Sequence, residues 1–209
     1  MAEYRLHCFA QSGNAYKVAL ALELAGADWE PVWVDFFKGA HRSPEFIALN
    51  AMAEVPVLEH KGRAMSQSGL ILDYLTGTLG RYRPVDEREG WRWILWDNHK
   101  LTANLATWRF MANFLPEEKR NQDVIAFLQS RAVTALKVLD RHLEGRAGIV
   151  GDELSTADLS CIGYMFFQDE YDFDWGSVPN LSAWRDRIAA LPRWKHPYEL
   201  MPGHPRAAG

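Results

Sequence analysis

The chain has 209 residues, of which 48% are hydrophobic, 24% charged and 12% aromatic. These fractions are typical of a globular protein, and the length allows one large domain or two small ones. The formal net charge of −4 disfavours a general nucleic-acid binder, which needs a basic surface. The sequence also lacks the apolar run of roughly 18 residues that a membrane span requires, and the hydrophobic segment of a secretion signal.

The two cysteines, Cys8 and Cys161, form neither a CxxC motif nor a metal-ligand cluster. Both lie in apolar stretches, so we expect buried free thiols in a reducing cytoplasm. On this basis we predict a cytoplasmic protein with no metal centre and no nucleic-acid or membrane partner.

The first 79 residues alternate strands and short helices. A strand, a helix and a second strand follow one another through short links, which predicts a βαβ unit with a parallel strand pair. Two further strands joined by a Lys61-Gly62 turn, and a closing helix, extend this unit to βαβ–ββα. The expected strands cover residues 4–9, 29–37, 55–60 and 63–65, and the expected helices cover residues 16–25, 43–49 and 68 onward.

Residues 80–89 are rich in glycine, proline and charge, and we predict that they form a linker. Beyond them only helical periodicity is convincing. The expected helices cover residues 89–115, 117–143, 156–167 and 180–191. We interpret Ser155 and Asp158 as a structural capping box at the start of the third of these helices. The sequence therefore predicts a small α/β domain over residues 1–79 and an all-helical domain over residues 90–209.

Three local signals in the first domain each have a plain and a functional interpretation. Ser12 follows the first strand and precedes a helix, so it is either an N-cap or a hydroxyl aimed at a ligand beside the electropositive helix end. Val55-Pro56 opens the third strand, where proline is tolerated without a role. A cis bond there would instead turn the Val55 backbone outward to pair with a peptide ligand. Gln67 and Ser68 precede the next helix, either as a cap or as the receiver of a ligand carboxylate.

These signals belong to four motifs that follow one another within about 75 residues: Ser-Gly-Asn at 12–14, Gly-Ala-His-Arg-Ser-Pro-Glu-Phe at 39–46, Leu-Asn-x-x-x-x-Val-Pro-Val-Leu at 49–58 and Ser-Gln-Ser-Gly-Leu-Ile-Leu-Asp-Tyr-Leu at 66–75. Taken together, these motifs resemble the glutathione-binding domain of the cytosolic glutathione transferases. In the second half, Gly-Asp-Glu-Leu-Ser-Thr-Ala-Asp at 151–158 and Pro-Asn-Leu-Ser-Ala-Trp at 179–184 are similar to a capping element and a late helix of that family. The resemblance spans nearly the whole chain and implies a thioredoxin-like domain followed by a helical domain, in a bacterial member of the serine type.

The resemblance also implies a role for each matching residue at a glutathione site. Ser12 would be the catalytic residue and would hydrogen-bond the glutathione sulfur, with Asn14 as the alternative contact of the sulfur. His41 and Arg42 would hold the glycine carboxylate of glutathione.

The remaining contacts would come from the two segments that flank the third and fourth strands. Val55 would pair with the cysteinyl backbone, Pro56 would be the cis-proline of the family, and Gln67 with Ser68 would bind the γ-glutamyl group. Two departures stand out. Glu54 occupies a position near the glycyl end where many members have Gln or Lys, so an attraction there is missing or inverted and more of the binding depends on His41 and Arg42. Gln67 occupies a position where many members have Glu, so a charge opposite the ammonium group of the ligand is lost.

Residues 89–115 are rich in tryptophan, most of which we expect in the core or in a subunit interface. A second stripe of this segment mixes polar and aromatic residues at helical spacing, so we predict that it faces the cleft between the domains and binds an apolar co-substrate. This stripe contains Trp93, Asp97, Lys100, Asn104, Thr107, Met111 and Phe114. The residues that we assign to this electrophile site are Asn104, Thr107, Trp108 and Met111.

The activity that the resemblance implies is conjugation, in which the glutathione thiolate attacks a small hydrophobic electrophile. Ser12 would stabilise the thiolate by donating a hydrogen bond, aided by the N-terminus of the following helix. The family also implies a homodimer. The alternatives are a glutathione-dependent isomerase, peroxidase or dehalogenase, and a non-catalytic binding or protein-interaction module. A dithiol reductase is disfavoured, since the motif contains no cysteine.

Overall fold

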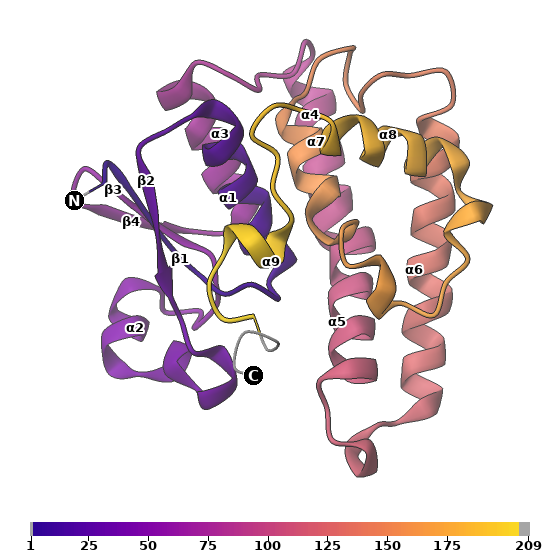
Figure 1. Cartoon of the computed structure of the whole chain (residues 1–209), viewed down its shortest axis with the longest axis horizontal. Helices are drawn as coiled ribbons and strands as arrows, with labels where there is room; N and C mark the ends of the chain where they lie inside the picture. The colour runs from indigo at the N-terminus through magenta and orange to yellow at the C-terminus, as the bar shows by residue number, and fades with distance from the viewer. Residues whose placement is uncertain (1, 205–209) are drawn as a thin grey trace. The chain divides into compact units, whose positions relative to one another are not determined.

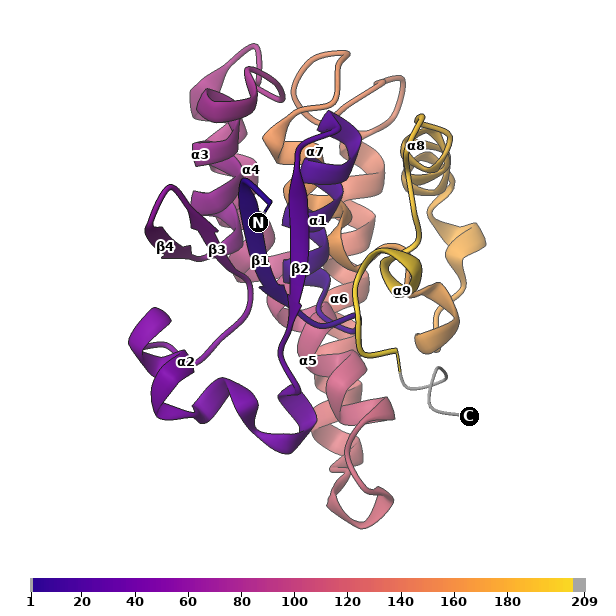
Figure 2. The ribbon, with the colours of Figure 1, turned by 60° about the vertical axis from the view of Figure 1, so that its left-hand side comes forward.

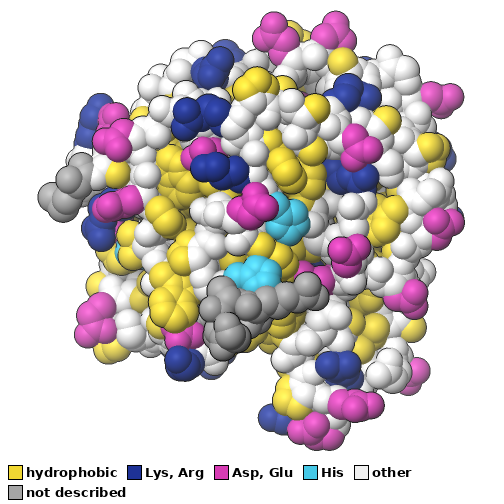
Figure 3. Space-filling view, viewed as in Figure 1, with side chains coloured by type: hydrophobic (Ala, Val, Ile, Leu, Met, Phe, Trp, Pro, Cys, Tyr) yellow, Lys and Arg dark blue, Asp and Glu magenta, His cyan; other side chains and the backbone are white. Residues whose placement is uncertain are grey.

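The computed structural model describes residues 2–204, which form two compact units. Unit 1 contains residues 2–83 and 190–204, and unit 2 contains residues 84–189, so the division falls inside the predicted linker. Residues 205–209, at the end of the predicted helical domain, lie outside the described residues. On the face drawn in Figure 3, Lys and Arg side chains are scattered among Asp and Glu side chains.

Unit 1 is built on a four-stranded sheet in the order β2-β1-β3-β4. The strands are β1 (Tyr4–Cys8), β2 (Trp29–Trp33), β3 (Val57–His60) and β4 (Arg63–Ser66), and the helices that accompany them are α1 (Gly13–Ala25), α2 (Pro44–Leu49) and α3 (Ser68–Leu79). β1 pairs in parallel with β2 and antiparallel with β3, and β3 pairs antiparallel with β4. The predicted βαβ–ββα arrangement is confirmed. β2 is shorter than predicted, because the aromatic run continues into a 3-10 turn at Phe36–Lys38.

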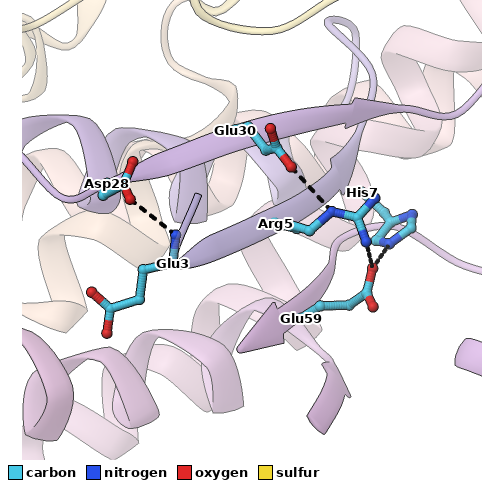
Figure 4. A network of polar contacts seen from close by, with 6 residues as sticks. All are labelled: Glu3, Arg5, His7, Asp28, Glu30 and Glu59. Carbon is cyan, nitrogen blue, oxygen red and sulfur yellow. Dashed lines mark hydrogen bonds and ion pairs between the residues drawn. The ribbon is translucent and has the colours of Figure 1, made fainter. Parts of the chain in front are cut away.

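The two faces of this sheet differ in character. Side chains alternate between the faces of a strand, and the register partners Leu6 and Leu58 are fully buried. α1 and α3 lie side by side against the sheet (Figures 1 and 2). The neighbouring register partners Arg5 and Glu59 form an ion pair of 3.1 Å on the other face, where Arg5 also pairs with Glu30 (Figure 4). One face therefore belongs to the core and the other carries charge.

Helix α1 has clear signals at both ends. It begins at Gly13, earlier than predicted, because Ser12 is the N-cap and its Oγ accepts a hydrogen bond from the Ala15 N–H at 3.1 Å. It ends at Ala25 as predicted, where Gly26 adopts the left-handed conformation with φ of 69°. Both ends are thus fixed by local sequence.

Residues 190–204, including the short helix α9 (Pro197–Leu200), correct the sequence-based division, which placed them in the helical domain. They belong to unit 1 because polar side chains tie them to α1. Lys195 Nζ lies 2.9 Å from Glu23 Oε1, and the Tyr16 hydroxyl donates to the Lys195 carbonyl oxygen at 2.9 Å. Such contacts leave no periodic pattern in the sequence, so the sequence could not predict them.

Unit 2 contains helices and no strand among its described residues. Its α-helices are α4 (Glu87–Trp96), α5 (Thr102–Asn113), α6 (Gln122–His142), α7 (Thr156–Cys161) and α8 (Pro179–Ala189). The long helix predicted over residues 89–115 corresponds to α4 and α5, which a π-helical turn at Asp97–Leu101 joins. The helix predicted over residues 156–167 ends early at Cys161 and continues as a 3-10 turn, Ile162–Tyr164. The apolar composition of this segment reflects its burial and does not indicate where the helix ends.

A buried carboxylate supports the centre of unit 2. Asp158 accepts hydrogen bonds from the backbone N–H and the hydroxyl of Ser155, which confirms the predicted capping box. Its other oxygen accepts from the Ile149 N–H and from the Trp184 indole, both at 2.9 Å. One side chain thus joins the start of α7 to α8 and to the loop before α7.

Cys8 and Cys161 are buried free thiols, as predicted. Burial raises the pKa of Cys8 to about 12. Within residues 2–204 no helix combines the length and apolar character that a membrane crossing needs. The same residues contain no cluster of three or more His, Cys, Asp or Glu side chains suited to a metal ion.

Candidate functional site

The strand directions of unit 1 bring the predicted glutathione residues to one edge of the sheet. β1 and β2 are parallel, so both end at this edge, and the antiparallel pairings make β3 begin there and β4 end there. Ser12 therefore follows β1, His41 and Arg42 follow β2, Val55 and Pro56 precede β3, and Gln67 and Ser68 follow β4. Figure 2 shows α2 and the turns before it near the same end of the strands.

Ser12 combines a fixed position with a usable proton. It is buried, its N–H donates to the Phe9 carbonyl oxygen at 3.0 Å, and its Oγ accepts the capping bond from the Ala15 N–H. Because Oγ is the acceptor in that bond, the hydroxyl proton can be donated to a further group. The N-terminus of α1 adds partial positive charge at the same point. Both interpretations of Ser12, cap and donor, are therefore compatible.

The start of α3 lies against the start of α1. The Ser68 hydroxyl donates to Asn14 Oδ1 at 3.5 Å, so two helix N-termini face one region. Gln67, at φ 71°, is the N-cap of α3, and Ser68 is its first helical residue. The Ser68 side chain is therefore not the cap of α3, which corrects the plain interpretation of this serine.

The segment before β3 has the geometry that the resemblance implies. The Val55–Pro56 peptide bond is cis. Neither the N–H nor the C=O of Val55 forms a hydrogen bond with another residue of the described range 2–204. An extended peptide could therefore pair with these two groups as an added strand.

Glu54 and Gln67, the two residues that differ from the family pattern, contact each other. The Gln67 amide nitrogen donates to Glu54 Oε2 at 3.3 Å, and it also lies 3.1 Å from the Met52 sulfur. The carboxylate of Glu54 therefore sits beside Gln67. The sequence suggested two independent changes of charge, and the contact shows that they are coupled.

His41 and Arg42 are adjacent in the chain but lie in different environments. Arg42 is exposed, whereas His41 is buried and stacks on Phe36 with ring centroids 4.1 Å apart. The Nδ1 atom of His41 has no hydrogen-bond partner among residues 2–204. Burial and, secondarily, the charge of Arg42 lower the pKa of His41 from 6.5, against a hydrogen bond to the Phe36 backbone. At neutral pH the positive charge of this pair therefore resides on Arg42.

An aromatic column that the sequence reasoning missed lines this edge. Phe9 stacks on Phe36 at 4.7 Å, and Phe36 stacks in turn on His41. Phe37 contacts both phenylalanines edge-on and is half exposed. The only sequence signal was the aromatic composition of residues 29–37, which had been assigned to a strand.

The four residues predicted for the electrophile site are all in α5 but have different surroundings. Trp108 is buried against Tyr171, with ring centroids 5.0 Å apart, and lines a cavity of about 440 Å³ within unit 2. Asn104 is buried, accepts from Arg131 Nε at 3.2 Å and lines a separate cavity of about 360 Å³. Thr107 is exposed and Met111 is half-buried. Trp108 and Asn104 thus line different cavities of unit 2, and the assignment of the four residues to an electrophile site stays a prediction.

The fold and the edge site together define the class of protein. A βαβ–ββα sheet unit with a cis-proline before its third strand, in one chain with a helical unit, is the arrangement expected of a cytosolic glutathione transferase. The family description "Glutathione S-transferase, N-terminal domain" matches residues 3–77, and "Glutathione S-transferase, C-terminal domain" matches residues 101–192. The chain belongs to the glutathione S-transferase family.

Individual relatives agree with this assignment. Glutathione S-transferase 1 of Dianthus caryophyllus is 30% identical over 160 residues, covering 74% of this chain and 72% of the relative. Maleylacetoacetate isomerase of Rhizobium meliloti (strain 1021) is 28% identical over 209 residues, covering 94% and 97%. Among solved structures, a glutathione S-transferase from Pseudomonas fluorescens [Pf-5] superposes with a TM-score of 0.87 at 28% identity, covering 94% of this chain and 100% of that one.

Proposed function

We propose that this protein is a glutathione transferase that ionises the glutathione thiol at Ser12 for attack on a small hydrophobic electrophile. The observation that carries this proposal is the meeting of two helix N-termini through the Ser68–Asn14 contact, with the Ser12 hydroxyl proton available beside one of them. An anionic sulfur is favoured at such a point.

In this proposal each part of glutathione has a partner at the edge site, and His41 and Arg42 would hold its glycine carboxylate. Ser12 would contact the sulfur and the Val55 backbone would pair with the cysteinyl residue. Gln67 and Ser68 would receive the γ-glutamyl end, with the Ser68 hydroxyl and the N-terminus of α3 facing its carboxylate. The Glu54 carboxylate beside Gln67 supplies the negative charge for the γ-glutamyl ammonium group that a glutamate at position 67 would otherwise provide.

The proposed reaction requires only a moderate free energy of thiolate stabilisation from the site. A free thiol has a pKa near 8.5 and is mostly protonated at pH 7. Lowering this pKa by about two units requires about 2.7 kcal/mol of preferential thiolate stabilisation. A hydroxyl hydrogen bond and a helix N-terminus can supply that together. Ser12 is too weak a base to take the proton, so it acts by donating to the anion, while binding brings the two reactants together.

The direct test replaces Ser12 by alanine. We expect Ser12→Ala to lower kcat with a generic aromatic electrophile by about tenfold or more, and to raise the pKa of bound glutathione measured from thiolate absorbance. Ser43→Ala is the matched control, because Ser43 caps α2 by the same type of bond, to the Phe46 N–H. Unchanged turnover and thiol ionisation in Ser12→Ala would contradict the proposal and move the role to Asn14, which Asn14→Ala then tests.

A second activity is favoured by one comparison. The isomerase from Rhizobium meliloti covers nearly the whole chain, and a thiolate that adds to a double bond and later leaves would isomerise it without net conjugation. The same ionised thiol serves both reactions, so product analysis with an unsaturated diacid as substrate separates them. Recovery of isomerised substrate without a glutathione adduct would favour the isomerase.

We also propose a cytoplasmic homodimer whose helical unit binds the electrophile. Exposed apolar side chains on α4, Trp91 and Leu95, suit an interface between copies of the chain. Thr107 and Met111 are the predicted electrophile contacts with the greatest exposure on α5. The molar mass in solution measures the oligomeric state.

A further inference from the structure

The last described part of the chain runs along α1 from its end to its start. We call residues 190–204 the C-terminal strap. Near the end of α1, Arg193 Nε donates to the Glu23 carbonyl oxygen at 2.8 Å, and Lys195 pairs with the Glu23 side chain. Further back along α1, the Tyr16 hydroxyl donates to the Lys195 carbonyl oxygen. In Figure 1 the strap, with α9, is the yellow segment drawn over α1 and β1.

The far end of the C-terminal strap reaches the loop that carries Ser12. The Ala10 N–H donates to the Pro202 carbonyl oxygen at 2.7 Å, and the Gln11 side-chain amide donates to the Gly203 carbonyl oxygen at 3.0 Å. Residues 10 and 11 immediately precede Ser12. Two consecutive strap carbonyls therefore hold two consecutive residues of this loop.

Gly203 makes this approach possible. Its φ is +88°, a conformation that residues with a side chain rarely adopt. A Cβ atom at this position would lie 2.5 Å from the Trp33 indole nitrogen, far inside contact distance. Any side chain at position 203 would therefore have to displace the end of the strap or the Trp33 ring at the end of β2.

We propose that the C-terminal strap is a positioning element for Ser12, with Gly203 as the residue that lets it reach the loop. This inference rests on the proposed role of Ser12. Without the Pro202 carbonyl, the buried Ala10 N–H loses its acceptor, and the loop is no longer held from that side. The Ser12 hydroxyl then spends less time at the position that contacts the sulfur, and the thiolate loses stabilisation.

The test is Gly203→Ala in the full chain, with three measurements. We expect faster amide hydrogen exchange in residues 9–12 without glutathione, a rise of about one unit in the pKa of bound glutathione, and kcat about tenfold lower. The KM for glutathione should change little, because the groups that bind both ends of the peptide are untouched. Gln11→Met removes the bond to Gly203 while keeping the side-chain length, and should shift exchange and pKa in the same directions.

Gly145→Ala is the matched control. Gly145 also has a positive φ, of +69°, but lies in unit 2 with nothing within 4 Å of the position a Cβ would take. It should leave the exchange of residues 9–12, the thiol pKa and kcat as in the parent. Thiol pKa and kcat that stay unchanged in Gly203→Ala, while Ser12→Ala shifts both, would overturn the strap proposal and leave the proposed function intact. No shift in Ser12→Ala itself would reject the proposed function, and the role of the strap with it.

Discussion

Arg42 and His41 are neighbours in the chain but differ in burial and charge, so we predict different contributions from them at the proposed binding site for the glycine carboxylate of glutathione. Burial keeps the pKa of His41 below 6.5, so the ring is neutral at pH 7, while Arg42 is exposed and charged. We therefore expect Arg42→Gln to weaken glutathione binding at pH 7 more than His41→Gln does. Titration calorimetry of both variants measures this. A larger loss of affinity in His41→Gln would show that a neutral donor, rather than the arginine charge, holds the carboxylate.

Single residues also show how far sequence reasoning about the site reaches. The pattern located Ser12, Val55 and Ser68 at strand ends, because strand ends are visible as breaks in periodicity, and the roles of these residues toward glutathione stay predictions. It could not find the contact between Gln67 and Glu54, because that contact depends on the β3–β4 register and on two side-chain rotamers. The sequence also did not predict the stacking of His41 on Phe36, because it depends on the rotamers of both side chains.

At the scale of elements, Asp158 fixes how α7 begins. Its carboxylate accepts four hydrogen bonds, from Ser155, Ile149 and Trp184, and is almost fully buried. Asp158→Ala would leave these donors without their acceptor, so we expect a loss of about 3 kcal/mol or more in the free energy of unfolding. Chemical denaturation measures this loss, with the exposed Asp152→Ala as control. Equal stability of the two variants would contradict the role of the capping box.

The sequence predicted the type of the helices and strands well and their boundaries less well. β1 and α1 were found because alternation, capping residues and Gly26 all lie within a few residues of one another. The predicted helix over residues 156–167 was too long, because a segment that is buried on all sides has no polar face to mark where its helix ends. The π-helical turn between α4 and α5 was invisible, since one such turn barely disturbs the spacing of apolar residues.

At the scale of unit 1, Glu23 makes the attachment of the C-terminal strap to α1 depend on pH. Burial acts to raise the pKa of Glu23, but hydrogen bonds from Lys195 and Trp29 and the nearby positive charges outweigh it and lower the pKa below 4.5. A carboxyl group whose pKa is lowered by folding adds stability above its ordinary pKa and loses it as the pH falls through the lowered value. The strap should therefore loosen from α1 below about pH 4.5.

Glu23→Gln tests this coupling. It should be less stable than the parent at pH 7, and the difference should shrink as the pH falls below 4.5, because the parent then loses the same charge. Hydrogen exchange of residues 190–204 at pH 7 and in acid follows the attachment directly. A constant stability difference over the whole pH range would show that the Glu23 charge does not hold the strap.

The burial of both cysteines bears on whether the proposed reaction would inactivate the protein. A catalyst that gathers alkylating agents beside an ionised sulfur exposes itself to them at high local concentration. Here Cys8 is inaccessible and essentially never a thiolate, and Cys161 is 1% exposed. In the proposed reaction the reactive sulfur would be that of the exchangeable tripeptide, so each alkylated sulfur would leave with the product, and inactivation through Cys8 and Cys161 would be avoided.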